Sequence, residues 1–322
     1  MKFWNLLYDR LKQINPDVTL ITYAYSSYRN APSPERPLTA KAVIQFVDGL
    51  DGFENWKGWS AMGVDLFLRP NWWHQGADAP YLSLDQSAEF IKFAWNNRMR
   101  GLDMDSILGY WATQGPNYYL VARLMTQPEL TKDEILAEYT SAFGDGAPKI
   151  REYLDYWQKI SNEYNYAINA AGSEVKKNSK FQDLVNAKKI PGSILNGSKY
   201  ALPYLYTDEV LAPGLALLDE AEALIGTGDE EATQRVAFLR KGIESLKATR
   251  AQVILGQELK KAPTQERVTA FEEGDRKLTA IREALSIDHV IWGESAKVYE
   301  GRYQILLRPS ALEFNQINLD GM

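Results

Sequence analysis

The order of its strand and helix patterns constrains this chain more than any other sequence feature. Residues 1–130 contain four short apolar runs, at 18–25, 42–47, 64–68 and 101–107, which alternate with amphipathic segments of helical period. Such alternation is typical of βα units around a parallel sheet, because a parallel connection needs a crossover helix. The first run is apolar and β-branched enough for a strand buried on both faces. From residue 131 onward the pattern is purely helical.

The expected helices are marked by apolar spacing and by end signals. The helix at 3–14 is stopped by Pro16, and Ser83 is the expected N-cap of a helix over residues 84–98. Thr131 and Glu134 have the spacing of a capping box, which starts a helix to residue 143. Residues 172–206 are expected to be irregular, and residues 288–322 give no assignable pattern. Other helices are expected at 53–62, 149–170, 208–225, 230–259 and 265–286.

The strand count suggests an incomplete barrel. Four strands with interleaved helices are half of a (β/α)8 barrel, and the chain opens on a helix. An open four-stranded parallel sheet would leave exposed edges, which natural proteins avoid. The predicted fold class is therefore α/β: the C-terminal half of a (β/α)8 TIM-type barrel over residues 1–130, followed by an α-helical domain with an unassigned tail over residues 131–322. The earlier strands would come from a missing segment or a partner chain, or two chains would pair their exposed sheet edges.

Composition excludes several classes of function. The chain has no cysteine, which excludes thiol nucleophiles and Cys-ligated metals. The two histidines, His74 and His289, lie far apart in sequence, so no metal and no other cofactor is predicted. The net charge of −6 comes without a basic stripe, which argues against nucleic acid as a partner. No apolar run is long enough to span a membrane, and the N-terminus lacks the pattern of a signal peptide.

Polar and aromatic side chains gather where the predicted strands end. In (β/α) barrels the functional residues lie at the carboxyl ends of the strands and in the loops after them. Aromatic rings beside amides, carboxylates and guanidinium groups are typical of a sugar-binding cleft, since a sugar ring has apolar faces and polar edges. The candidate substrate-binding residues are Tyr23, Tyr25, Tyr28, Asp48, Arg69, Asn71, Trp72, Trp73, His74, Tyr110, Trp111 and Gln114.

Each of these residues also has a structural interpretation. Aromatic side chains fill ordinary protein cores, and a strand tyrosine suits a structural role as well as a binding role. Trp72, Trp73 and His74 favour the binding interpretation, because they follow a proline in a loop-like stretch and exposed loop aromatics tend to serve binding.

Asp103 and Asp105 are the candidate catalytic residues. They lie two positions apart in a predicted strand and so share one side of it. Two neighbouring carboxylates can raise the pKa of one of them and provide a general acid. The same spacing also suits hydroxyl binding or pairing with Arg98 or Arg100, and glycoside cleavage requires carboxyl groups on facing positions. The catalytic residues therefore stay unassigned, and the sequence leaves open whether the chain is an enzyme.

Several stretches resemble a bacterial domain family formerly of unknown function. They are ITYAYSSYRNAP (21–32), MRGLDMDSILGYWATQGPNYYLVARLM (99–125), QPELTKDEILAEYTSAFG (127–144) and PKIREYLDYW (148–157). The family is related to the TIM-barrel glycoside hydrolases, and some members are classified in glycoside hydrolase family 163, endo-β-N-acetylglucosaminidases that act on complex N-glycans. The resemblance covers residues 1–165 and is most specific over residues 111–119.

The resemblance implies a secreted or periplasmic protein that handles glycans or polysaccharides. In related barrels that use the N-acetyl group of the substrate, adjacent catalytic acids end the fourth strand, and this chain would begin after that strand. It would then supply sugar contacts such as Tyr25, Asn71, Trp72, Asp105 and Trp111 without the full acid/base pair. Two alternatives remain: a non-catalytic carbohydrate-binding protein, and a structural or assembly module with a vestigial barrel.

Overall fold

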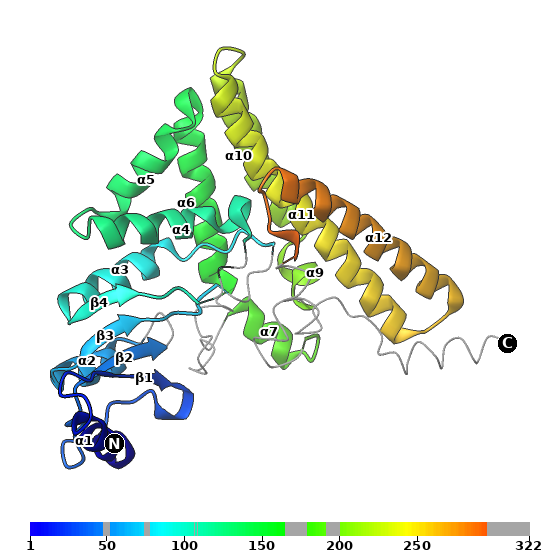
Figure 1. The fold of residues 1–322 in the computed structure, drawn as a ribbon. Helices are drawn as coiled ribbons and strands as arrows, with labels where there is room; N and C mark the ends of the chain where they lie inside the picture. The colour runs from blue at the N-terminus through cyan, green and yellow to red at the C-terminus, as the bar shows by residue number, and fades with distance from the viewer. Residues whose placement is uncertain are drawn as a thin grey trace.

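The chain forms a mixed α/β structure with a sheet at one end and a large helical part. The computed structural model describes residues 1–47, 52–73, 78–105, 107, 109–164, 179–190 and 200–294. In Figure 1 the strands lie at the lower left, and the helices rise above them and extend to the right. The expected order, βα units followed by helices, is confirmed for the described residues.

The sheet contains four parallel strands in sequential order. They are β1 (Leu20–Tyr25), β2 (Ala42–Val47), β3 (Asp65–Leu68) and β4 (Met99–Leu102). The strand expected at residues 101–107 begins earlier than predicted, because Met99 pairs with Leu66 and a register shift follows between Leu66 and Phe67. Asp103 and Asp105 consequently lie just beyond β4 rather than within it.

Helices cover one face of this sheet in the part of the chain that the structure describes. Alternate strand residues such as Ile44, Phe46 and Leu66 are fully buried. The Phe46 ring lies 5.1 Å from that of Trp56 in α2 (Phe53–Ala61), and α3 (Leu84–Asn96) adds Phe90, 5.9 Å from Trp56. These contacts place the helix layer on the face of the even-numbered residues of β1 and β2.

The other face of β1 is exposed. Burial alternates along this strand, so that Ile21 keeps 64% of its surface exposed and Tyr23 and Tyr25 are also exposed. The expectation of a strand buried on both faces is therefore wrong for β1. The apolar run at 18–25 predicts a strand correctly, but it does not indicate whether one face or both faces of that strand are covered.

The helical part begins earlier than the sequence suggested. Helix α4 (Trp111–Thr126) starts where no helix was assigned, because Gly115 and Pro116 weaken the helical pattern. It forms with Ala112, Leu120 and Leu124 buried on one face. Two short helices, α7 (Lys180–Asn186) and α9 (Leu202–Leu205), lie in the stretch predicted to be irregular. The other elements are α1 (Lys2–Lys12), η1 (Ser26–Tyr28), α5 (Lys132–Ser141), η2 (Gly144–Gly146), α6 (Ala147–Tyr164), α10 (Asp208–Ile225), α11 (Glu230–Lys261) and α12 (Gln265–Ile287).

The two predicted helix caps behave differently. Thr131 and Glu134 form the capping box, with Thr131 Oγ1 accepting from the Glu134 N–H at 3.2 Å and the Thr131 N–H donating to the Glu134 carboxylate at 2.7 Å. The hydrogen bond from the Thr131 backbone lowers the pKa of Glu134. Ser83 does not cap α3 through its side chain, because its hydroxyl accepts from Trp73 Nε1 (2.8 Å) and pairs with Ser87 Oγ (3.0 Å).

A continuous hydrophobic core joins the sheet to the helices. It runs from Leu20 in β1 through the buried faces of α3 to α6 and reaches α10 and α11. The pair α11 and α12 extends away from it at the right of Figure 1. None of the described helices is long and apolar enough to span a membrane.

The packing of α10 against α6 depends on a glycine. A Cβ at Gly214 would lie 2.6 Å from Cζ2 of the fully buried Trp157. We expect Gly214→Ala to lower the free energy of unfolding by about 1–3 kcal/mol, because the Trp157 ring has no room to move. Gly115→Ala in α4 is the control, since its Cβ would meet no atom within 4 Å and alanine favours the helix by about 0.5–1 kcal/mol. Guanidinium unfolding measures both variants, and equal stability of the two would contradict the close packing.

Candidate functional site

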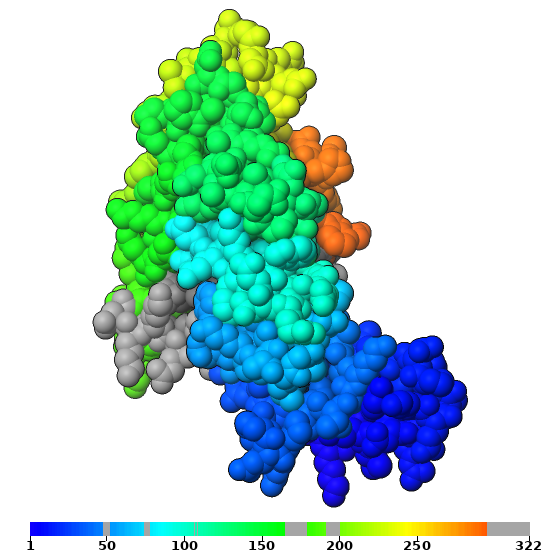
Figure 2. Space-filling view, turned by 90° about the vertical axis from the view of Figure 1, so that its left-hand side faces the viewer, coloured from blue at the N-terminus to red at the C-terminus, as the bar shows by residue number. Residues whose placement is uncertain are grey.

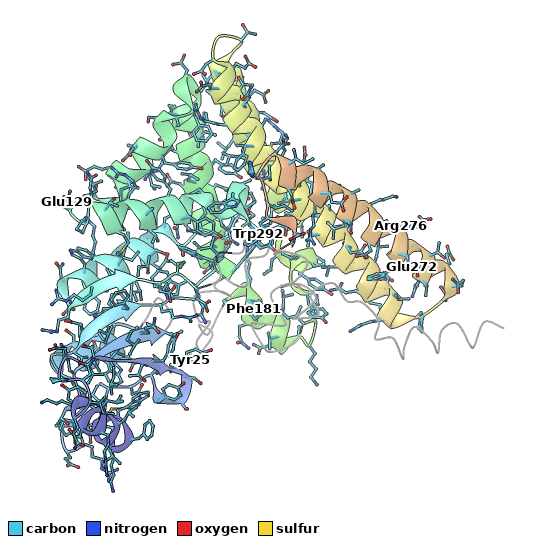
Figure 3. The ribbon with its side chains drawn as sticks, viewed as in Figure 1. Tyr25, Glu129, Phe181, Glu272, Arg276 and Trp292 are labelled. Atoms are coloured by element: carbon cyan, nitrogen blue, oxygen red, sulfur yellow. The ribbon has the colours of Figure 1, made fainter. Side chains whose placement is uncertain are left out.

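Three exposed tyrosines lie at the carboxyl end of β1. Tyr23 and Tyr25 are two positions apart and therefore share one face of the strand, and Tyr28 follows in η1. All three side chains are exposed, Tyr25 to 41% of its surface. Figure 3 shows Tyr25 at the end of the sheet that faces the helical part.

Arg69 links Tyr23 to the two aspartates. Its Nη1 donates to Asp105 Oδ2 at 3.2 Å, and its Nε lies 3.4 Å from Asp103 Oδ2. Its guanidinium carbon is 5.4 Å from the centre of the Tyr23 ring, a cation–π distance. We call Tyr23, Tyr25, Arg69, Asp103 and Asp105 the strand-end cluster.

The backbone fixes the position of this cluster. The Arg69 N–H donates to Phe46 O at 2.8 Å, and the Asp103 N–H donates to Leu68 O at the same distance. The Asp105 N–H donates to Pro70 O at 3.0 Å. These bonds extend the pairing of β2, β3 and β4 past the strand ends, so Arg69, next to the Tyr23 ring, meets the aspartates that follow β4.

The chemistry of the cluster suits hydroxyl recognition. Carboxylates accept hydrogen bonds from hydroxyl groups, a guanidinium donates to them, and a tyrosine ring can stack on an apolar C–H face. Asp103 and Asp105 both contact the same guanidinium rather than face each other across a gap. This arrangement differs from the facing carboxyl groups of glycoside cleavage.

Other candidate residues are buried, which differs from the binding role expected for them. Trp72 keeps 1% of its surface exposed, and its ring packs 5.7 Å from that of Phe90. A ring enclosed on both faces cannot stack on a sugar, so in this structure Trp72 fills the core beneath α3. The sequence stretch after Pro70 looked like an exposed loop, but it turns under the helix layer. Asn71, Trp73, Tyr110 and Gln114 are likewise buried.

Trp111 is the exposed candidate among the residues of α4. It is 43% exposed, and its ring lies 5.2 Å from that of Tyr118. Burial raises the pKa of Tyr118, whose hydroxyl donates to Gln114 Oε1 at 3.0 Å. The half-buried Tyr118 and the buried Gln114 thus support an exposed ring.

Trp292 is an exposed aromatic residue that the sequence analysis missed. Its N–H donates to Gly109 O at 2.8 Å, and Ala112 N–H donates to Val290 O at 3.2 Å. The segment after α12 therefore contacts the start of α4, the helix whose first residue is Trp111. Gly109 has φ +76°, and a Cβ there would lie 2.4 Å from the Trp292 Cβ. In Figure 3 Trp292 lies apart from Tyr25.

A buried ionic network ties the loop after β3 to the helical part. Asp78 accepts hydrogen bonds from Ser245 Oγ and, at 2.8 Å, from Thr249 Oγ1, both in α11. Arg282 of α12 lies 3.6 Å from Asp78 Oδ1 and donates to Thr249 Oγ1 at 3.0 Å. A buried carboxylate needs such partners, because leaving water is costly for a charge. No local sequence signal identifies Asp78, since its partners lie far along the chain.

Two candidates, Asp48 and His74, lie outside the described residues. The described residues contain no group of three or more histidine, cysteine, aspartate or glutamate side chains that could hold a metal ion. The prediction that no metal is bound stays a prediction.

Comparison with known proteins gives a family match for part of the chain. Residues 1–155 match the model of a domain of unknown function, DUF4838. Neither the curated proteins nor the solved structures gave a match. The matched residues include the sheet, the strand-end cluster and Trp111, and the match ends within α6. Trp292 and the helical partners of Asp78 lie beyond it.

The buried and exposed tryptophans should respond differently to truncation. We expect Trp72→Ala to lower the free energy of unfolding by about 3–5 kcal/mol, because it leaves a cavity in the core. Trp111→Ala should cost less than about 1 kcal/mol, since much of its ring already faces water. Guanidinium unfolding measures both, and a small loss for Trp72→Ala would show that this ring is not part of the core.

Loss of Asp78 should also be costly. Asp78→Ala leaves Arg282 buried without its carboxylate, and we expect a loss of about 3–5 kcal/mol in unfolding free energy. Asp85→Ala is the matched control, because Asp85 is exposed and its ion pair with Lys132 should contribute no more than about 1 kcal/mol. Thermal and guanidinium unfolding of the two variants test this, and similar losses would contradict the importance of the buried network.

Proposed function

We propose that this chain handles glycans or polysaccharides as a glycoside-hydrolase-like protein, with the strand-end cluster as its sugar contact. The observation that carries this proposal is the exposed Tyr23 ring beside Arg69, which holds two carboxylates, with Tyr25 exposed on the same face of β1. Ligands of parallel α/β sheets bind at the carboxyl ends of the strands, where this cluster lies. Aromatic faces with charged hydrogen-bonding groups match the mixed surface of a sugar.

The finer fold within this proposal is the C-terminal half of a (β/α)8 barrel. Support comes from the sequential order of four parallel strands and from the helix layer on one face of the described sheet. The face that carries Ile21, Tyr23 and Phe67 would be the inner face of the barrel, which alternate strand residues fill in such folds. The sequence resemblance to glycoside hydrolase family 163 suggests complex N-glycans as the substrate class and a secreted or periplasmic location.

The same proposal assigns this chain a binding role without a complete acid/base pair. Asp103 and Asp105 share one guanidinium, which supports hydroxyl binding over facing acid and base. A non-catalytic carbohydrate-binding protein has the same support from these contacts. We expect the isolated chain to bind glycan without cleaving it. Release of shortened glycan would contradict the proposal that its acid/base pair is incomplete.

Isothermal titration with complex N-glycan oligosaccharides tests the sugar contact. We expect Tyr23→Ala and Tyr25→Ala to weaken binding by about 1–3 kcal/mol, because each removes an aromatic surface from the strand-end cluster. Trp95→Ala is the control, since Trp95 in α3 is 38% exposed and lies in the helix layer.

Equal weakening in all three variants would point to a general loss of stability. Absence of binding by the parent chain to these oligosaccharides would contradict the proposed substrate class.

A further inference from the structure

The residues after α12 present an exposed tryptophan on a fixed backbone. Trp292 keeps 57% of its surface exposed. Its N–H donates to Gly109 O at 2.8 Å, and the N–H of the next residue, Gly293, donates to Ser286 Oγ at 2.9 Å. These two consecutive backbone hydrogen bonds hold the chain that carries the exposed ring.

The end of α12 directs this segment back toward α4. His289 has a left-handed backbone, with φ +56°, and the Val290 N–H donates to Leu285 O at 3.0 Å. This hydrogen bond is typical of a Schellman motif, which reverses the chain at the end of a helix. Val290 and Leu285 pack in one buried cluster with Ala112 of α4. The aliphatic side chains of this turn are therefore buried, whereas the tryptophan that follows them is exposed.

Trp111 is the exposed neighbour of Trp292 on the α4 side. It lies in the chain between Gly109 and Ala112, whose backbones both bond to residues 290–292. Its ring is 43% exposed, and its edge-to-face ring contact, at 79°, leaves at least one face of the indole outside that contact. In Figure 2, orange atoms of α12 and of the residues after it lie at the surface beside the blue-green atoms of the earlier helices. Two exposed indole rings thus come together from distant parts of the chain.

The connection between β4 and α4 links these rings to the strand-end cluster. Asp105 lies four residues before Gly109, so at most about 14 Å separates their Cα atoms. Because Trp292 lies apart from Tyr25 in Figure 3, the rings and the cluster are two separate contacts. A ligand that reaches both of them has to be an extended chain.

The surroundings of Trp292 favour a sugar as the occupant. The neighbouring residues Asp288, His289 and Glu294 are exposed and polar, whereas Val290 is buried. Sites that dock proteins are contiguous apolar patches. A ring set among polar groups instead matches a sugar, because the ring covers an apolar C–H face and the indole N–H can donate to a hydroxyl.

We infer that Trp111 and Trp292 form a second carbohydrate subsite, which binds a further sugar residue of the glycan that contacts the strand-end cluster. This inference rests on the proposed function. It makes the ligand an oligosaccharide of several residues rather than a single sugar. Trp292 lies beyond the matched residues 1–155, so the subsite is shared between the matched domain and the helical part.

Isothermal titration with two ligands tests the inference: a complex N-glycan oligosaccharide and a disaccharide from the same glycan. We expect Trp292→Ala and Trp111→Ala to weaken oligosaccharide binding about 5- to 30-fold, because each removes aromatic surface from the second subsite. Disaccharide binding should not change, because this ligand occupies the strand-end cluster alone. Tyr23→Ala should weaken the binding of both ligands. The matched control is Trp95→Ala, the same truncation at an exposed tryptophan near the opposite ends of the strands, and it should change neither affinity.

A conservative variant protects the test against misfolding. Trp292→Phe keeps an aromatic ring and should retain most of the oligosaccharide affinity, and circular dichroism should show the helical content of the parent chain in every variant. Unchanged oligosaccharide affinity in Trp292→Ala, or equal weakening for both ligands, would overturn the second subsite. If Tyr23→Ala still weakens binding in that case, the proposed function stands. A parent chain that binds neither ligand would overturn both, so the two failures are distinguishable.

Discussion

Coverage of the sheet by helices on one face is the constraint from which the other features of this structure follow. Within the described residues, Trp56 and Phe90 bury the even-numbered side chains of β2 and fix which way each strand faces. The odd-numbered side chains of β1 are then directed to the other face. Because Tyr23 and Tyr25 both fall on that face, one strand delivers two rings to the same end of the sheet.

The helical part contributes to this end of the sheet as well. Asp78 is anchored in α11 and α12, and Trp292 returns to the start of α4 through Gly109. Both connections join segments that are far apart in the chain. They explain how a helical part beyond the matched domain can hold Asp78, after β3, and Gly109, after β4. Of the two connections, the buried network around Asp78 is the one whose disruption should cost more stability, because an unpaired charge in the core is strongly destabilising.

Local patterns predicted those features that local physics determines. The β-branched run before Tyr25 and the spacing of Thr131 and Glu134 gave a strand and a capping box, because both depend on neighbouring residues. Trp72 looked exposed after Pro70, yet tertiary packing places it beneath α3. The partners of Asp78 lie more than 160 residues away, so no window of sequence could have identified them. The sequence correctly placed Tyr23 and Tyr25 at the end of a strand. It did not distinguish the aromatic residues that are exposed from those that are buried.

Hydrogen exchange, measured with and without complex N-glycan oligosaccharides, tests most directly whether the carboxyl edge of the sheet contacts sugar. We expect slower exchange at residues 25–29 and 103–105 when the oligosaccharide is bound, and unchanged exchange in α5 and α6. Protection confined to the helical part, with none at these strand ends under saturating ligand, would contradict the sugar contact.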